Sequence, residues 1–586
     1  MITITIENDG QVLNVKKGSN LLKVLNKNGY KVKSPCGGKG TCKKCKVKIR
    51  AVDSKNYEYK TVLSCNYVID ESIAVQLRDE DQFVDKKSGL IPSQRYSLDH
   101  QFNWIPLKLE KALLNKEISL VNRIEKAIGL RLEISLDMLQ NIARTIGMDS
   151  FDGFLLLDGH RLLTIESEKK PVLGVAIDIG TTTMVMYLVD LEKGIVLDVV
   201  SASNPQITHG ADVISRITYS SESDDHRLEL QTMVVQEINR MSEQLLQTNG
   251  YTATSIVNSA ICGNTTMMHM FLGLDVNHIA LAPYLATYQS IDPVSVKDTK
   301  LLWNQEGQVY IMPNIAGYVG ADTVSVILAN RLDQSKKNIL ALDLGTNGEI
   351  ALSVDKKIYT CSTAAGPAFE GASIEFGMRA DLGAIESVRV HDGKIEVETI
   401  QNAPAIGICG SGLIDAVAKL KNAGLIDPSG KIVNEDVVPD YAAWLGKYQG
   451  QKAILLCSKH VEGAQEIWLT QKDVRELQLA KGAMLAGMNI LLSRAGIQAE
   501  ELDNIYLAGA FGSFIDTKSA QDINMFPVID QNKIISVGNS AGLGAIMTLF
   551  SNKQKIRAEK ISIKANYTEL SSDREFNQAF TASLML

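Results

Sequence analysis

The chain has 586 residues, which is too long for one hydrophobic core, so several domains are expected. Its composition, 45% hydrophobic and 22% charged, is ordinary for a globular protein, and the net charge of −7 argues against general nucleic-acid binding. No apolar run approaches the roughly 20 residues of a membrane span. The first residues lack the apolar block of a signal peptide, so a cytoplasmic protein with no membrane partner is expected.

Residues 1–80 predict a small domain of strands and one helix. Polar and apolar residues alternate from Met1 to Ile6, and a second strand is expected from Gln11 to Val15. A helical stretch from Asn20 to Asn28 follows, and a glycine-rich loop comes after it.

Four cysteines form the most informative pattern of this domain: Cys36, Cys42, Cys45 and Cys65. Three thiolates in one glycine-rich loop and a fourth from a distant segment are typical of ferredoxins, which hold a 2Fe–2S cluster in this way. Zinc is the alternative ligand, but four-thiolate zinc sites usually contain two short Cys-x-x-Cys pairs, and this segment contains only one. The order of elements resembles the β-grasp fold of plant-type and adrenodoxin-type ferredoxins. The remaining cysteines predict buried, inert thiols: Cys262, Cys361, Cys409 and Cys457.

Basic residues crowd the cysteine loop and the strand after it: Lys39, Lys43, Lys44, Lys46, Lys48 and Arg50. Such a run is often only a solvated face. The alternative is a docking patch for an acidic redox partner, and the sequence leaves both interpretations open.

Residues 81–104 predict a linker, because most of this stretch is polar and has no clear periodicity. A small α/β middle domain is expected over residues 105–170. Helical spacing predicts a helix from Leu109 to Ile128, and Ser135 can cap a second helix that ends at Gly147. Two apolar runs, Phe154–Leu157 and Arg161–Ile165, predict a hairpin. This domain contains no chemical motif, so a spacer or docking role is the default.

From residue 171 onward the pattern changes to long alternating strands and helices, and it contains an internal repeat. The segment Val175–Thr183 recurs in form as Leu340–Glu349, and each copy is an apolar strand that ends in Asp-x-Gly-Thr before a second strand. The two aspartates, Asp178 and Asp343, are 343 − 178 = 165 positions apart.

A strand, a tight turn and a second strand expose backbone N–H groups around a glycine and make a concavity that holds anions. The two turns therefore predict a nucleotide phosphate site made of Gly180, Thr181, Thr182, Gly345, Thr346 and Asn347. Asp178 and Asp343 are the predicted catalytic carboxylates, which would hold Mg²⁺ through waters. A third segment, Asn504–Gly512, is a strand that runs into a turn of small residues, where Gly509 and Ala510 would leave room for a ribose or adenine ring.

Together these three segments resemble the phosphate and adenosine motifs of the superfamily that includes actin, sugar kinases and heat-shock chaperone ATPases. The resemblance implies a two-lobed, ribonuclease H-like ATPase domain over residues 171–586. The expected fold class is thus multidomain α/β, with a β-grasp ferredoxin domain, a linker, a small middle domain and this ATPase.

Further strings look like those of reductive activators of corrinoid proteins: Asn204-Pro205-Gln206, His209-Gly210-Ala211-Asp212-Val213-Ile214-Ser215-Arg216, Gly263-Asn264-Thr265-Thr266 and Gly407-Ile408-Cys409-Gly410-Ser411-Gly412. The resemblance implies transfer of one electron from the 2Fe–2S cluster to the Co(II) corrinoid of a partner protein, driven by ATP, which restores Co(I) for methyl transfer. It also implies reduced ferredoxin or a similar electron donor, and a homodimer through the middle domain.

Some assignments stay open within this resemblance. Ser411 either caps a helix or contacts the nucleotide, and Asp322 or Glu370 could polarise the attacking water or anchor a loop. Three other functions remain as alternatives: a small-molecule kinase with a redox domain, an ATP-gated activator of another low-potential enzyme, and a plain electron carrier.

Overall fold

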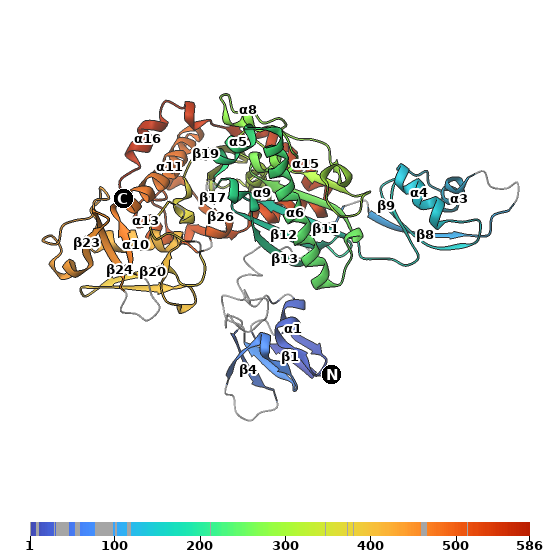
Figure 1. The fold of residues 1–586 in the computed structure, drawn as a ribbon, viewed down its shortest axis with the longest axis horizontal. Helices are drawn as coiled ribbons and strands as arrows, with labels where there is room; N and C mark the ends of the chain where they lie inside the picture. The colour runs from blue at the N-terminus through green and yellow to red at the C-terminus, as the bar shows by residue number, and fades with distance from the viewer. Residues whose placement is uncertain are drawn as a thin grey trace.

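The structure is a computed structural model. It describes residues 2–7, 11–28, 30, 46–52, 59–76, 98–99, 102–113, 119–210, 212–345, 347–371, 373–378, 380–458, 466–512 and 514–586. Figure 1 shows a small N-terminal β domain, a small α/β domain around β8 and β9, and a large body of two lobes. Within the described ranges, no helix has both the length and the apolar character that a membrane span requires.

The N-terminal domain is a mixed five-stranded sheet in the order β2-β1-β7-β4-β5. Its strands are β1 (Ile2–Ile6), β2 (Val12–Val15), β4 (Lys46–Ala51), β5 (Lys60–Leu63) and β7 (Ile73–Gln76). β1 pairs in parallel with β7, and helix α1 (Leu21–Lys27) packs its buried Leu21 and Leu25 against Ile4 and Ile6. A parallel central pair with a helix packed on it is the β-grasp arrangement that the sequence predicted.

The small α/β domain has a three-stranded sheet in the order β10-β9-β8. Its elements are β8 (Phe102–Leu109), α3 (Leu120–Ile128), α4 (Leu136–Thr145), β9 (Phe151–Asp158) and β10 (Arg161–Glu166). Ser135 caps α4 as expected, because its hydroxyl accepts a hydrogen bond from the Met138 N–H at 3.1 Å. The predicted hairpin is present as β9 and β10.

The predicted helix from Leu109 to Ile128 is wrong in its first part. Leu109 ends strand β8, and that strand begins at Phe102, inside the predicted linker. Buried Leu107 and Leu109 flank an exposed lysine, which is the period of a strand and not of a helix. The helix starts only at Leu120. Ser119 caps it, because the Ser119 hydroxyl accepts a hydrogen bond from the backbone N–H of Asn122 in the first turn.

The first lobe is built on a six-stranded sheet in the order β13-β12-β11-β14-β16-β15. The strands are β11 (Leu173–Ile179), β12 (Thr183–Asp190), β13 (Ile195–Ser203), β14 (Ile256–Gly263), β15 (Val294–Ser295) and β16 (Gln308–Ile311). Helix α6 (Asp224–Asn249) packs on β12 and β13, and α14 (Ser540–Phe550) packs on β11 and β14. Helix α9 (Ala321–Ala329) lies against α14.

The second lobe is built on a sheet in the order β27-β26-β17-β18-β19-β28. The strands are β17 (Ile339–Leu344), β18 (Gly348–Val354), β19 (Lys357–Thr363), β26 (Asn504–Ala508), β27 (Ile534–Gly538) and β28 (Asn566–Tyr567). Helix α10 (Gly410–Asn422) packs on β20 (Ala384–His391), a strand of a smaller sheet, and the long helix α11 (Gln471–Ala495) packs on β18 and β19.

The two large sheets repeat one another. The order β13-β12-β11-β14-β16 in the first lobe corresponds to β19-β18-β17-β26-β27 in the second, and each lobe has its own apolar core. Asp178 and Asp343 are both the next-to-last residue of the central strand. The internal repeat in the sequence is therefore a repeat of the fold, and the two-lobed actin-like class is confirmed.

Candidate functional site

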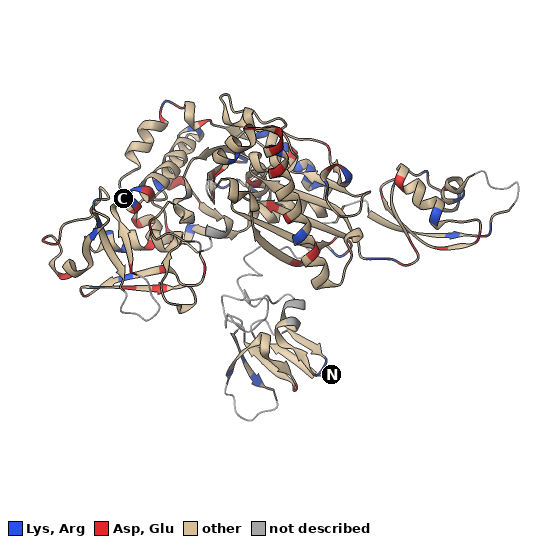
Figure 2. Ribbon diagram, viewed as in Figure 1, with Lys and Arg blue, Asp and Glu red and all other residues tan. Residues whose placement is uncertain are grey.

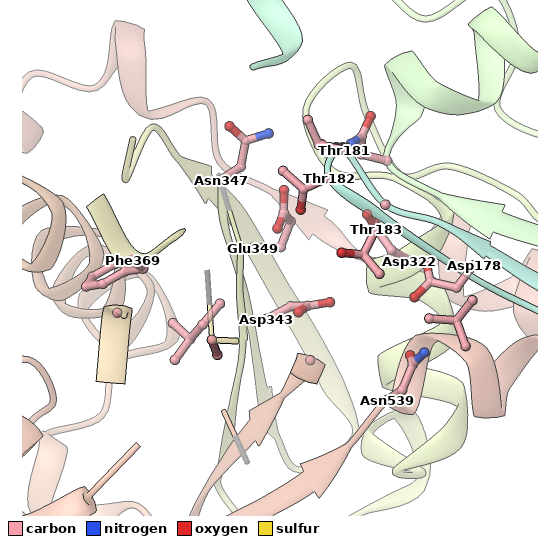
Figure 3. A pocket seen from close by; sticks show the side chains of 18 of the residues that line it. Asp178, Thr181, Thr182, Thr183, Asp322, Asp343, Asn347, Glu349, Phe369 and Asn539 are labelled. Atoms are coloured by element: carbon pink, nitrogen blue, oxygen red, sulfur yellow. Dashed lines mark hydrogen bonds between the residues drawn. The ribbon is translucent and has the colours of Figure 1, made fainter. Parts of the chain in front are cut away.

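A cavity of about 490 Å³ lies between the two central hairpins. The residues of the predicted nucleotide site that line it are Asp178, Gly180, Thr181, Thr182, Asp343, Gly345, Asn347 and Gly509. Figure 3 shows Thr181 and Thr182 at the turn of the first lobe and Asn347 at the turn of the second. Thr346 and the side chain of Ala510 lie outside the described residues. The fold thus brings together, from positions far apart in the chain, most of the residues that the sequence singled out.

In each hairpin turn, the glycine N–H donates a hydrogen bond to a carbonyl two or three residues ahead. The Gly180 N–H donates to the Thr183 carbonyl at 3.0 Å, and the Gly345 N–H donates to the Asn347 carbonyl at 3.1 Å. A Cβ atom on Gly180 would lie 2.5 Å from the Thr183 carbonyl oxygen, so glycine is needed for this turn. Tight turns of this kind can present backbone N–H groups to an anion.

Four carboxyl groups converge on the cavity from both lobes: Asp178, Asp322, Asp343 and Glu349 (Figure 3). Burial raises the pKa of Asp178 to about 8, with further contributions from the charges of Asp343 and Asp322. Burial also raises the pKa of Asp343 to about 7 and that of Asp322 to about 6. The pKa of Glu349 is raised well above its usual range, again mainly by burial. Acids in such surroundings are stable when they are protonated or when a cation lies beside them.

Within the part of the chain that the structure describes, no three His, Cys, Asp or Glu side chains are arranged to hold a metal ion by themselves. Mg²⁺ does not require such a cage, because it keeps several waters and shares phosphate oxygens with one or two carboxylates. The chemistry of the cavity, with two amide-bearing turns and buried carboxyls, fits a hydrated Mg²⁺ together with a phosphate chain.

The second lobe adds an apolar end to the cavity through Phe369, Met378 and Phe514. β26 runs parallel to β17 and ends beside it, which brings Gly509 next to Asp343. Gly509 has a φ of +81°, and a Cβ there would lie only 2.7 Å from the Asp343 Oδ1 atom. Glycine therefore leaves space next to this carboxyl that any side chain would fill.

The capping interpretation of Ser411 is wrong. Helix α10 has Cys409 at its N-cap, no side chain makes a capping hydrogen bond there, and Ser411 lies within the first turn. Ser411 and Gly410 instead line the cavity. Of the two carboxyls considered for water activation, Asp322 lines the cavity, and the side chain of Glu370 is outside the described part.

Sequence reasoning gave no role to four polar residues of the cavity lining: Thr183, Asn264, Glu349 and Asn539. Glu349 lies directly opposite Asp343 in the antiparallel register of β17 and β18. In the sequence, Glu349 was recognisable as the single acidic residue of a mostly apolar strand. Asn539 hydrogen-bonds to Asp178 and caps α14 by accepting from the Gly542 N–H at 2.9 Å. Its signal was a capping residue between a glycine and an apolar helix.

Of the four predicted cluster cysteines, Cys65 lies within the described residues, whereas Cys36, Cys42 and Cys45 lie outside them. Cys65 belongs to the short 3₁₀ helix Ser64–Asn66 and is buried in the core of the N-terminal domain. Its carbonyl accepts a hydrogen bond from Asn20 Nδ2 at 2.7 Å, which fixes the local backbone. A soft thiolate held on a fixed backbone is the type of ligand that an iron–sulfur cluster uses. The other four cysteines are buried, as predicted.

Figure 2 shows basic residues on β4, the strand that follows the cysteine loop in the sequence. Arg50 on this strand donates a hydrogen bond to Glu7 Oε1 at 2.8 Å, so its positive charge is partly neutralised within the domain. The choice between a solvated face and a docking patch stays open.

The sequence matches three family models along its length. These are the 2Fe-2S iron-sulfur cluster binding domain over residues 4–70, the RACo middle region over 173–335, and the C-terminal domain of RACo, the ASKHA domain, over 337–586. A curated relative, the corrinoid activation enzyme RamQ of Eubacterium limosum, is 34% identical over 567 residues, which is 94% of this chain and 93% of the relative. The chain belongs to the family of reductive corrinoid activators.

The chain is also similar to a solved structure and to a second curated relative. A solved structure called "Reductive activator for corrinoid,iron-sulfur protein" superposes with a TM-score of 0.74 at 32% identity, covering 100% of this chain and 98% of that one. A "[Co(II) methylated amine-specific corrinoid protein] reductase" of Methanosarcina barkeri is 26% identical over 451 residues, which is 70% of this chain and 76% of the relative. The match over residues 4–70 supports a 2Fe–2S cluster and not zinc. The region that the family model calls middle contains all six strands of the first-lobe sheet, and it begins after the small α/β domain.

Proposed function

We propose that this activator converts the Co(II) corrinoid of a partner corrinoid protein to Co(I) by an ATP-dependent transfer of one electron. The names of two relatives, which describe corrinoid activation and corrinoid protein reduction, support the proposal. The structural observation that carries it is a cavity between two lobes, with glycine turns and buried carboxyls, in the same chain as a 2Fe–2S domain. When bound, a 2Fe–2S cluster supplies electrons singly, which is what reduction of Co(II) to Co(I) requires.

ATP is useful here because the electron must move uphill. Plant-type clusters have potentials near roughly −400 mV. Each further ~100 mV costs one electron about 2.3 kcal/mol. Nucleotide binding between the lobes and its hydrolysis can supply several such increments, if they change the surroundings of the electron acceptor.

Each part of the cavity receives a role in this proposal. The backbone N–H groups of the turns that begin at Gly180 and Gly345 bind phosphate oxygens. Asp178 and Asp343 hold the hydrated Mg²⁺ that neutralises the phosphate charge. Asp322 is fixed at the start of α9, where its Oδ1 accepts a hydrogen bond from the Thr323 N–H at 2.6 Å, and it orients the attacking water.

Other parts of the proposal come from the family resemblance. Thr346 would bind phosphate beside Asn347, and Ala510 would lie at the nucleoside with Gly509. Reduced ferredoxin or a similar carrier would be the electron donor, and the activator would form a homodimer.

The test compares Asp178→Asn with Asp198→Asn. Asp198 lies on β13, where its carboxylate accepts a hydrogen bond from Asn249 at 2.9 Å, and it is not part of the cavity lining. We expect Asp178→Asn to keep the visible absorption of the cluster but to abolish the ATP-dependent loss of Co(II) absorbance in a corrinoid protein supplied with reductant. The Asp198→Asn variant should behave as the wild type.

Two results would contradict the proposal. Unchanged rates in Asp178→Asn would refute the phosphate-site assignment. Equal rates with and without ATP in the wild type would refute the ATP dependence.

A further inference from the structure

Two residues of the family strings, Asn204 and Arg216, have no role in the proposed chemistry. Both contact the backbone of the first-lobe turn, residues 180–183, on the side away from the cavity. The carbonyl oxygens of three consecutive residues in this turn each accept a hydrogen bond from Asn204 or Arg216. Asn204 Nδ2 donates to the Gly180 carbonyl at 2.9 Å, Arg216 Nη2 to the Thr181 carbonyl at 2.5 Å, and the Asn204 N–H to the Thr182 carbonyl at 2.9 Å. Neither Asn204 nor Arg216 lines the cavity.

These contacts determine where the N–H groups of the turn point. In a trans peptide the C=O and the following N–H lie in one plane and point in opposite directions. Because the Gly180 and Thr181 carbonyls are held toward Asn204 and Arg216, the N–H groups of Thr181 and Thr182 are directed the other way, toward the cavity that both residues line. Figure 3 shows both threonines among the side chains that line the cavity.

Arg216 is well suited to this task because it cannot easily move. Its side chain is fully buried, and it is among the largest such side chains in the described chain. Besides Thr181, it donates through Nε to the Gly210 carbonyl at 2.8 Å and through Nη1 to Gln206 Oε1 at 3.4 Å. A guanidinium stays charged in proteins, so this contact also places a positive charge behind a turn that would face phosphate.

Asn204 and Arg216 form one network and not two separate contacts. Gln206 accepts from Arg216 and donates its own backbone N–H to Asn204 Oδ1 at 3.0 Å. On the cavity side, Asn264 Nδ2 donates to Thr181 Oγ1 at 3.0 Å, so the side chain of Thr181 is also held. The peptide planes of the turn are thus fixed before any ligand arrives, which lowers the cost of ordering them during binding.

We propose that Asn204 and Arg216 are positioning residues for phosphate binding, which act through the peptide groups of Thr181 and Thr182. The inference rests on the proposed function, because it assumes that the cavity binds the phosphates of ATP. It goes beyond that function by giving a task to residues that never touch the nucleotide.

The test uses two asparagines with the same local geometry. Asn304, like Asn204, is buried, accepts at Oδ1 from the N–H two residues ahead (2.9 Å, from Glu306), and donates through Nδ2 to a distant carbonyl (3.2 Å, to Thr254). It does not line the cavity, although it belongs to the same lobe. Calorimetry would measure binding of ATP and of adenosine, each with Mg²⁺, to the full-length wild type, Asn204→Ala and Asn304→Ala.

We expect Asn204→Ala to weaken ATP binding about ten- to a hundred-fold. Releasing the Gly180 carbonyl would let the following peptide group turn, and the Thr181 N–H would lose its hydrogen bond to a charged phosphate oxygen. Adenosine has no phosphate, so its affinity should stay the same. Asn304→Ala should change neither affinity. A purely structural role for Asn204 would instead weaken ATP and adenosine alike, and that result would overturn the inference.

Arg216→Lys is the second variant, and it decides the question if Asn204→Ala does not fold. Lysine keeps the charge but lacks the fork that reaches Thr181, Gly210 and Gln206 together, so the same ATP-selective loss is expected. Normal ATP affinity in a folded Arg216→Lys variant would overturn the inference while leaving the proposed function intact. A wild type that binds no ATP would refute both.

Discussion

The buried carboxyls should make binding of the Mg²⁺–nucleotide complex strongly dependent on pH. Mg²⁺ interacts with carboxylates and not with protonated acids, so each acid that helps to hold it must first be ionised. The pKa is about 7 for Asp343 and about 8 for Asp178. Between pH 6 and pH 8 the ionised fraction of a group with pKa 7 rises about tenfold, and that of a group with pKa 8 about fiftyfold.

These fractions give the expected size of the effect. If only Asp343 must be ionised, affinity should rise about tenfold from pH 6 to pH 8, and if Asp178 must be ionised as well, about 500-fold. Protons should be released on binding, because the cation lowers both pKa values. Calorimetry with ADP and excess Mg²⁺, in buffers of different ionisation heat at pH 6, 7 and 8, measures both the affinity and the number of protons released.

The matched control is Asp343→Asn. The nucleotide titrates in the same way with both proteins. The difference between their pH profiles therefore gives the contribution of the Asp343 carboxyl to the pH dependence of binding. The variant should lose about one factor of ten from the pH dependence. An affinity that does not change with pH, or an identical profile in the two proteins, would refute this reasoning.

The same acids affect the stability of the nucleotide-free protein in the opposite sense. Their folded pKa values lie above the unfolded values, so their contribution to stability is fully present at low pH. It is lost as pH rises through about 6 for Asp322, about 7 for Asp343 and about 8 for Asp178. The melting temperature of the nucleotide-free protein should therefore fall from pH 6 to pH 8, and Mg²⁺ with nucleotide should reduce this fall.

Two further substitutions test other parts of the structure. Gly509→Ala would place a methyl group 2.7 Å from Asp343 Oδ1, and nucleotide affinity should fall at least about tenfold. Gly496→Ala, at a φ of +73° with nothing within 4 Å, has a similar backbone penalty of about 1 kcal/mol but should bind nucleotide normally; equal affinities in the two variants would contradict the steric argument. Cys65→Ser should remove or strongly alter the visible absorption of the cluster while ATP binding persists, whereas Cys457→Ser, at a buried cysteine of the second lobe, should leave the spectrum unchanged. An unaltered spectrum in Cys65→Ser would remove this residue from the ligand set.

Local patterns were enough to predict much of this protein. The Asp-x-Gly-Thr turns at Asp178 and Asp343 were visible because a strand, a tight turn and a second strand are encoded by residues next to each other. The cap at Ser135 was predictable for the same reason. The prediction of a helix from Leu109 was wrong because it combined apolar residues at the end of strand β8 with those of helix α3. No proline or glycine between them marks the change from the strand period to the helix period.

The sequence by itself determined that two similar hairpins, a cysteine-rich domain and a third turn of small residues belong to one chain. Only the tertiary structure decided that Glu349 faces Asp343, that Asn539 reaches Asp178, and that Arg216 holds the Thr181 carbonyl. The reason is physical. Such contacts depend on strand register and on the packing of segments up to some 360 residues apart (539 − 178 = 361), and neither propensity nor spacing along the chain encodes them.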